Sequence, residues 1–248
     1  MQHHQKVTTR ALRNGRGRTK FIALVSVLAA LHIVLSIPPG PVGFRRLSII
    51  MEPLDGIIAG PMYGFAAAAI GWIGGRLARP EAVFVENFFG FAEAVGALGA
   101  GLLASRRWWV VAMLYGALLA GFLFHPFARE VPLWTLWDTY LGFFAIFPTA
   151  IAIRRLNTNL NAKVLAPVMA LITFVSVELD AMTRIFMLAD LGLYQMYGIP
   201  SNAWSAIFIA GAFQTPVESL YSMVIAAVVG VPVLIALRSA KILDWPLF

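Results

Sequence analysis

Long apolar stretches, separated by short polar ones, run through most of this chain. A helix needs about 20 apolar residues to cross a bilayer, and seven stretches have roughly that length. They lie at 20–37, 54–75, 84–104, 108–125, 133–153, 164–189 and 205–237. The breaks between them are rich in Pro, Gly and charge, and most are short enough to make neighbouring helices antiparallel. The pattern predicts an all-α fold, a polytopic transmembrane bundle of six or seven helices.

The composition leads to the same conclusion. Apolar residues make up 60% of the 248 residues and charged residues only 12%, about half of the charged fraction usual in soluble domains. A soluble domain of this length could not hide so much apolar surface, because its outer surface must be wet. A surface that faces lipid removes this difficulty. We therefore expect the lipid bilayer to surround most of the chain.

Basic residues crowd the N-terminus. The net charge is +7, and six Lys and Arg side chains fall within the first twenty residues. A basic segment before a first membrane helix is typical of the cytoplasmic side, and we prefer this interpretation to nucleic-acid binding. We predict a basic cytoplasmic tail over 1–19 and a single transmembrane domain over 20–248. The protein is then a multi-pass protein of the plasma membrane with a cytoplasmic N-terminus.

The remaining charges leave the number of crossings open. If all seven stretches cross, the loops on the two sides carry nine Lys and Arg residues each, although the cytoplasmic side should carry more. If one early stretch enters and leaves on the same side, the later loops move to the cytoplasmic side. The expected excess of basic residues then returns, and six crossings remain.

Several kinds of chemistry have no support in the sequence. The chain has no cysteine, which excludes disulfides and Cys-based metal sites. It also lacks an HExxH motif, a Walker A motif and a GxSxG nucleophile elbow, which are typical of metalloproteases, ATPases and serine hydrolases. We predict no cofactor, no metal and no enzymatic activity.

Ionisable residues lie deep within three of the stretches. A carboxylate in hydrocarbon costs a few kcal/mol, so Glu93 must face the bundle interior, a cavity or a partner. Asp180 and Arg184 are four residues apart and can pair on one helix face, whereas Glu178 points nearly the opposite way. Gln214 and Glu218 share one face of the last stretch.

Two interpretations of these residues stay open. In the structural one, Asp180 and Arg184 satisfy each other and Glu178 bonds a neighbouring helix, or the helix ends early and the charges lie at the interface. In the functional one, they line a polar ligand pocket, because ionisable groups inside a membrane usually mark one. The excess of acids would favour a cationic ligand. The candidate substrate-binding residues are Glu93, Glu178, Asp180, Arg184, Gln214 and Glu218.

Three segments of the first hundred residues carry a resemblance to a known family. The stretch from Ala23 to Leu31 is rich in small residues and precedes a Pro-rich loop, and the stretch from Leu54 to Phe65 contains a Gly-Pro-x-x-Gly run. The stretch from Phe88 to Leu103 begins with aromatic residues and Gly and ends Gly-rich. In this order and spacing, the segments resemble the substrate-binding S components of energy-coupling factor (ECF) vitamin importers.

The resemblance implies a helical bundle that captures a vitamin or related small micronutrient from outside the cell. A transmembrane coupling subunit and two cytoplasmic ATPase subunits then drive import. In the family, an Ala-x-x-x-Ala motif in the first helix docks onto the coupling subunit. The nearest match here is Ser26-x-x-x-Ala30, and Val27 stands four residues after Ala23. The candidate docking residues are Ala23, Ser26 and Ala30, with Gly60 and Gly64 from a row of small residues at four-residue spacing.

Two other functions remain as alternatives. One is an intramembrane enzyme that acts on a lipid through its buried carboxylates. The other is a stand-alone secondary transporter, although the internal repeat typical of that class is not evident. Catalysis by the purified chain alone would favour the enzyme, whereas association with ATPases would favour the importer subunit.

Overall fold

The computed structural model describes residues 2–42, 45–79, 86–156, 161–240 and 242, with backbone only at 2–18, 86, 87 and 201. This part of the chain consists of helices joined by loops and contains no β-strand. The helices are α1 (Gln2–Leu35), α2 (Met51–Ala59), α3 (Pro61–Leu77), α4 (Glu86–Ala104), α5 (Trp108–Phe124), α6 (Trp137–Arg155), α7 (Ala162–Ala189), α8 (Leu193–Met196), α9 (Trp204–Ile225) and α10 (Val231–Ser239). A π-helical turn, Ala226–Gly230, joins α9 to α10, and a 3₁₀ turn, Leu47–Ile50, leads into α2.

The predicted all-α fold is confirmed, and each predicted stretch lies mainly in helices, apart from residues 84 and 85, which lie outside the described residues. Three helical segments are long and apolar enough to cross a membrane, namely Leu133–Arg155, Ala162–Ala189 and Trp204–Ser239. Shorter apolar helices cover Thr19–Leu35, Phe88–Ala104 and Trp108–Phe124. The backbone of the predicted tail is helical from Gln2 and continues directly into the first apolar stretch.

The stretch 54–75 is two helices, and the prediction of a single helix there is wrong. The chain turns at Gly60, whose φ of +86° is in a region that glycine adopts readily. Pro61 then begins α3, where its missing N–H leaves no hydrogen bond unmade. Gly64 lies against Gly56, so α2 and α3 pack as an antiparallel hairpin with closely apposed backbones.

This reversal also breaks up the predicted row of small residues. Gly56 faces α4, where it lies against Ala97 and Ala100, whereas Gly64 closes the hairpin against α2. Both Gly60 and Gly64 are buried. The row therefore does not form one helix face, because the chain changes direction in the middle of it.

The short helix α2 lies at the centre of the molecule. All nine of its residues are buried, including the carboxylates of Glu52 and Asp55. It packs against α1, α3, α4 and α7. At 1.5 Å per residue it is only about 14 Å long, which is less than half of the hydrocarbon thickness of a bilayer.

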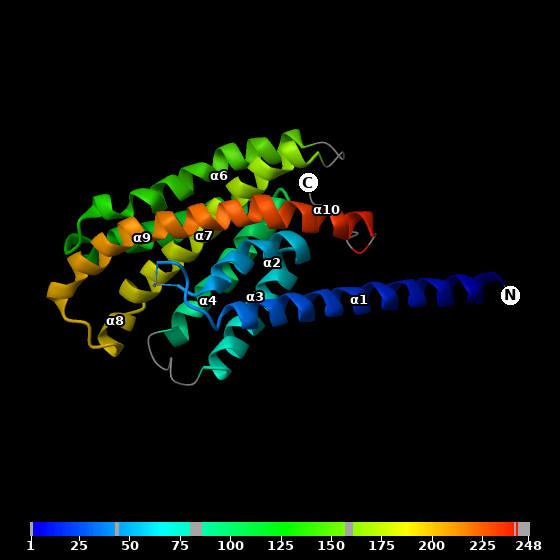
Figure 1. Cartoon of the computed structure of the whole chain (residues 1–248), viewed down its shortest axis with the longest axis horizontal. Coiled ribbons are helices and arrows are strands. Elements are labelled where there is room, and N and C mark those ends of the chain that lie inside the picture. Colours follow the sequence, from blue (N-terminus) through cyan, green and yellow to red (C-terminus); the bar gives the residue numbers. More distant parts are fainter. Residues whose placement is uncertain (1, 43–44, 80–85, 157–160, 241, 243–248) are drawn as a thin grey trace.

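Close contacts give the directions of the first helices. Gly71 of α3 lies against His32 and Gly75 lies against Ser36, so α3 runs parallel to α1. Gly90 of α4 lies against Trp72 and Gly101 lies against Pro61, so α4 runs antiparallel to α3. The later helices alternate in direction, and α10 ends on the side of the bundle from which α1 enters (Figure 1). The opposite end, where α1, α3 and α7 end and α4, α6 and α9 begin, is called the mouth end below.

Within this arrangement α7 is the most central long helix, packed against α4, α5, α6 and α9. The outer surface is strongly apolar. Met62, Leu77 and Phe124 are 71%, 79% and 88% exposed, respectively. A water-facing surface would not favour such side chains, whereas hydrocarbon would.

Candidate functional site

An unbroken series of buried acids and bases crosses the mouth half of the bundle. His32 of α1 is its starting point. Its Nδ1 lies 2.7 Å from Asp55 Oδ2 of α2, and its Nε2 lies 2.9 Å from Glu93 Oε2 of α4. Ser48 donates a further hydrogen bond of 2.9 Å to the same Glu93 oxygen. Glu93 thus faces the interior of the bundle, where side chains of other helices and loops contact it.

Arg184 continues the series from α4 to α7. Its Nη2 lies 3.3 Å from Glu93 Oε1, and its Nε donates to both oxygens of Asp180 at 3.0 and 2.9 Å. Arg45 then links Asp180 to α9. Its Nε lies 3.2 Å from Asp180 Oδ2 and its Nη1 lies 3.3 Å from Glu218 Oε2. We call these seven connected side chains the charge relay. They are, in order of contact, Asp55, His32, Glu93, Arg184, Asp180, Arg45 and Glu218.

Arg45, like His32 and Asp55, is a member that the sequence did not predict. It lies in the loop after α1, which folds inward and is closed by a 2.9 Å hydrogen bond from Gly40 N to Arg45 O. Burial lowers the pKa of the Arg45 guanidinium, but the carboxylates of Asp180 and Glu218 outweigh this and raise the pKa above its ordinary value. Arg45 therefore stays charged. The surplus of buried acids over Arg184 was the one sequence signal that a further base must enter the bundle.

The structural interpretation of α7 is borne out in part, because Asp180 and Arg184 form a pair but also contact Arg45 and Glu93, respectively. Asp180 and Arg184 form the expected pair on one face, and the Ser219 hydroxyl of α9 donates a 2.6 Å hydrogen bond to Glu178 Oε1 on the other face. The alternative in which the helix ends early is wrong, because α7 continues to Ala189. Glu178 lies against Gly142 of α6 and is fully buried.

A cavity of about 340 Å³ lies beside the charge relay, among α4, α6, α7 and α9. Its charged lining consists of Arg45, Asp138, Arg184 and Glu218, and most of the remaining wall is apolar. Apolar side chains in the wall include Phe89, Leu136, Ile185, Leu188, Ile207 and Phe208. Pockets of this size and character are typical of small-molecule sites.

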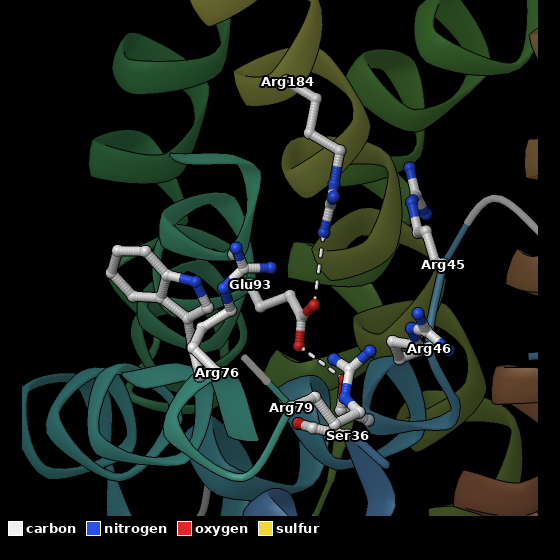
Figure 2. Close-up of a pocket in the computed structure, with 10 residues that line it drawn as sticks. Ser36, Arg45, Arg46, Arg76, Arg79, Glu93 and Arg184 are labelled. Carbon is white, nitrogen blue, oxygen red and sulfur yellow. Dashed lines mark hydrogen bonds and ion pairs between the residues drawn. The ribbon is translucent and has the colours of Figure 1, made fainter. Parts of the chain in front are cut away.

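A second, smaller hollow of about 30 Å³ adjoins the relay near the ends of α1 and α3. Figure 2 shows the arginine side chains that gather around Glu93 there. Its lining residues are Ser36, Arg45, Arg46, Ser48, Trp72, Arg76, Arg79, Gly90, Glu93 and Arg184. We call it the arginine hollow. Arg45 and Arg184 line both the arginine hollow and the larger cavity.

The predicted substrate-binding residues divide into three groups. Arg184 and Glu218 line the larger cavity and Glu93 lines the arginine hollow. Asp180 lies behind them and holds the two arginines in place. Glu178 and Gln214 are not among the residues that line either space. Sequence reasoning missed Asp138, which starts α6 and is separated from the other acids by a predicted loop.

The predicted docking residues also divide. Ala23, Ser26 and Ala30 are exposed on the outer face of α1, next to Val27 and Val34, which are 57% and 59% exposed. This face is available to lipid or to another protein. Gly60 and Gly64 are buried inside the α2–α3 hairpin, which leaves them no surface for a separate subunit.

The described residues contain no group suited to hold a metal ion, and they do not pair Glu178 with Asp180. No three His, Asp or Glu side chains there are arranged to hold a metal ion. The neighbouring acids Glu178 and Asp180 face different helices and have different partners.

Comparisons of the chain with protein-family models, with curated proteins and with solved structures returned no match.

Proposed function

We propose that this protein is the membrane-embedded substrate-capture subunit of an ECF-type importer for a vitamin or related small micronutrient. The observation that carries this proposal is the cavity of about 340 Å³ at the mouth end, with an apolar wall and a few charged groups at one side. Such a lining can surround the body of a small molecule and fix its orientation.

The proposed topology has six crossings and places the mouth end outside the cell. The α2–α3 hairpin then enters from the outside and returns to it, and the remaining helices cross. Basic residues at the proposed cytoplasmic end, besides the N-terminal ones, are Arg106, Arg107, Arg154, Arg155, Lys163 and Arg238. Those at the outer end are Arg45, Arg46, Arg76, Arg79 and Arg129. With seven crossings the two sides would carry equal numbers of Lys and Arg residues. With the hairpin counted as re-entrant, the proposed cytoplasmic side carries more of them, as expected.

The proposal requires partners, because the chain has no Walker A motif with which to use ATP. We propose a transmembrane coupling subunit and two cytoplasmic ATPases. The exposed face of α1 that carries Ala23, Ser26 and Ala30 is the proposed docking surface. Its small side chains would let a partner helix approach closely.

Affinity purification from the native host tests this function. The tagged chain should bring a coupling protein and two ATPases with it, and the complex should import a solute into proteoliposomes in an ATP-dependent manner. Ala30→Trp should abolish co-purification, whereas Leu141→Trp, on the exposed outer face of α6, should not. Turnover of a lipid by the purified chain alone would contradict the proposal.

The charge relay favours a second candidate, a proton-coupled secondary transporter. His32 lies between two carboxylates, and a histidine so placed can take up and release protons. In this case the purified chain alone would move its solute when a pH gradient is applied. His32→Gln would then abolish uptake, and no ATPase would be needed.

A further inference from the structure

We propose that the arginine hollow binds an anionic group, a carboxylate or a phosphate, and that the captured solute therefore has an apolar body with an anionic end. This inference rests on the proposed capture function and names the class of solute. The sequence alone predicted a cationic ligand, because acids outnumber bases within the predicted helices. The arginines that come from the loops change this prediction.

The composition of the lining is the first observation. Five arginines and one acidic residue, Glu93, are among the residues that line a space of about 30 Å³. A single water requires about half of that volume, so the hollow has room for a small anionic group. Arginine holds carboxylate and phosphate oxygens through two parallel hydrogen bonds, and the lining contains more basic than acidic side chains.

Hydrogen-bond donors without acceptors are the second observation. Arg45 is 7% exposed, and its Nη1 has no hydrogen-bond partner, although Glu218 Oε2 lies 3.3 Å away outside hydrogen-bond geometry. The indole Nε1 of Trp72 is also buried without a partner. Both side chains line the hollow. Buried donors are rarely left unsatisfied, and the oxygens of a bound anion would satisfy them.

The two side chains that the spaces share are the third observation. Arg45 and Arg184 line both the hollow and the larger cavity, so an anionic group at these arginines would lie next to the apolar wall. The apolar wall of the cavity suits a ring or a short alkyl body. The anionic end would then compete with Glu93 for Arg184, whose 3.3 Å contact to Glu93 is longer than its contacts to Asp180.

Three probes with the same aromatic body and different charges test this inference. They are 2-naphthoate, 2-naphthalenemethanol and 2-naphthylmethylamine, measured by calorimetry with the full-length protein in nanodiscs of phosphatidylcholine. We expect 2-naphthoate to bind at least about tenfold more tightly than the other two, because charge-assisted hydrogen bonds contribute more than neutral ones. Inorganic phosphate should weaken its binding by competition.

Arginine variants then locate the site. Arg76→Gln and Arg79→Gln should each weaken 2-naphthoate binding about tenfold while leaving the binding of 2-naphthalenemethanol unchanged. Arg129→Gln is the matched control, because Arg129 lies at the same end of the molecule, is exposed and does not line the hollow. Circular dichroism of each variant establishes that the helices are intact.

Three results would overturn the inference. The first is equal binding of the three probes, and the second is an equal effect of Arg129→Gln and Arg79→Gln. The third is a loss of co-purified phosphatidylglycerol in Arg79→Gln with 2-naphthoate binding unchanged, which would assign the hollow to a lipid headgroup. These results are independent of whether a coupling protein co-purifies, so failure of the solute class and failure of the capture function can be told apart.

Discussion

Replacing Arg184 with glutamine tests the charge relay at its central member. Arg184 contacts Glu93 at 3.3 Å and Asp180 at 2.9 and 3.0 Å, and its side chain is only 20% exposed. Glutamine removes the charge and leaves two buried carboxylates with fewer partners. Glu93 keeps His32 and Ser48, and Asp180 keeps Arg45.

The expected loss of stability follows from this count. Removing one partner of a buried ion pair costs about 3–5 kcal/mol when the other charge is left alone. Because both acids keep a partner, we expect a loss of about 2–3 kcal/mol, near the net strength of one charged hydrogen bond. For a chain of this size that corresponds to a melting temperature lower by about 4–12 °C.

Thermal unfolding in detergent, followed by the fluorescence of the seven tryptophans, measures this loss. The control is Arg129→Gln, which removes an exposed arginine at the same end of the molecule and should change the melting temperature little. The double variant Glu93→Gln/Arg184→Gln should lose less than the sum of its single variants, because the two side chains are in contact. If Arg184→Gln melts like Arg129→Gln, the acids and bases are solvated and the relay does not hold the helices together.

Three further predictions follow from the fold and the cavity. Gly56→Ala should destabilise the protein by about 1–3 kcal/mol, because the added methyl group collides with the Ala97 carbonyl. Gly211→Ala, with open space around it, should melt like the wild type, and equal melting temperatures for both variants would contradict the close packing of α2 against α4. In this cysteine-free chain, Glu130→Cys should react with a membrane-impermeant maleimide in intact cells and Arg107→Cys only after permeabilisation. The reverse pattern would invert the proposed topology. Glu218→Gln should weaken 2-naphthoate binding several-fold, because Glu218 positions Arg45 at the cavity. Glu178→Gln, which is not on the cavity wall, should bind like the wild type, and equal losses in both variants would mean that the solute lies elsewhere.

The positions of the helices could be predicted because they depend on the spacing of apolar residues. The turn at Gly60 could not, because α2 and α3 are both apolar and join without a polar loop. Glycine within an apolar stretch is also common in membrane helices, so Gly60 alone was not a sufficient signal. The direction of every later helix depends on this one turn.

The charged site was predictable where its members share a helix. Asp180 and Arg184 pair at four-residue spacing, and the need of Glu93 for a partner followed from its depth. Arg45 and the arginines around the hollow were not predictable as a group, since they come from two loop regions and a helix end that only the folded chain brings together. For the same reason, the predominance of basic residues around the hollow could not be predicted from the sequences of the helices.

The most direct test of the capture function is to identify what the protein carries. The chain is purified in mild detergent and denatured, and the released small molecules are identified and quantified by mass spectrometry. We expect a compound with an apolar body and an anionic end, at close to one molecule per chain. It should be missing from Gly211→Phe, in which the new ring occupies the open space beside Gly211 on the cavity wall. Release of lipids and detergent alone, in equal amounts from both proteins, would contradict the account.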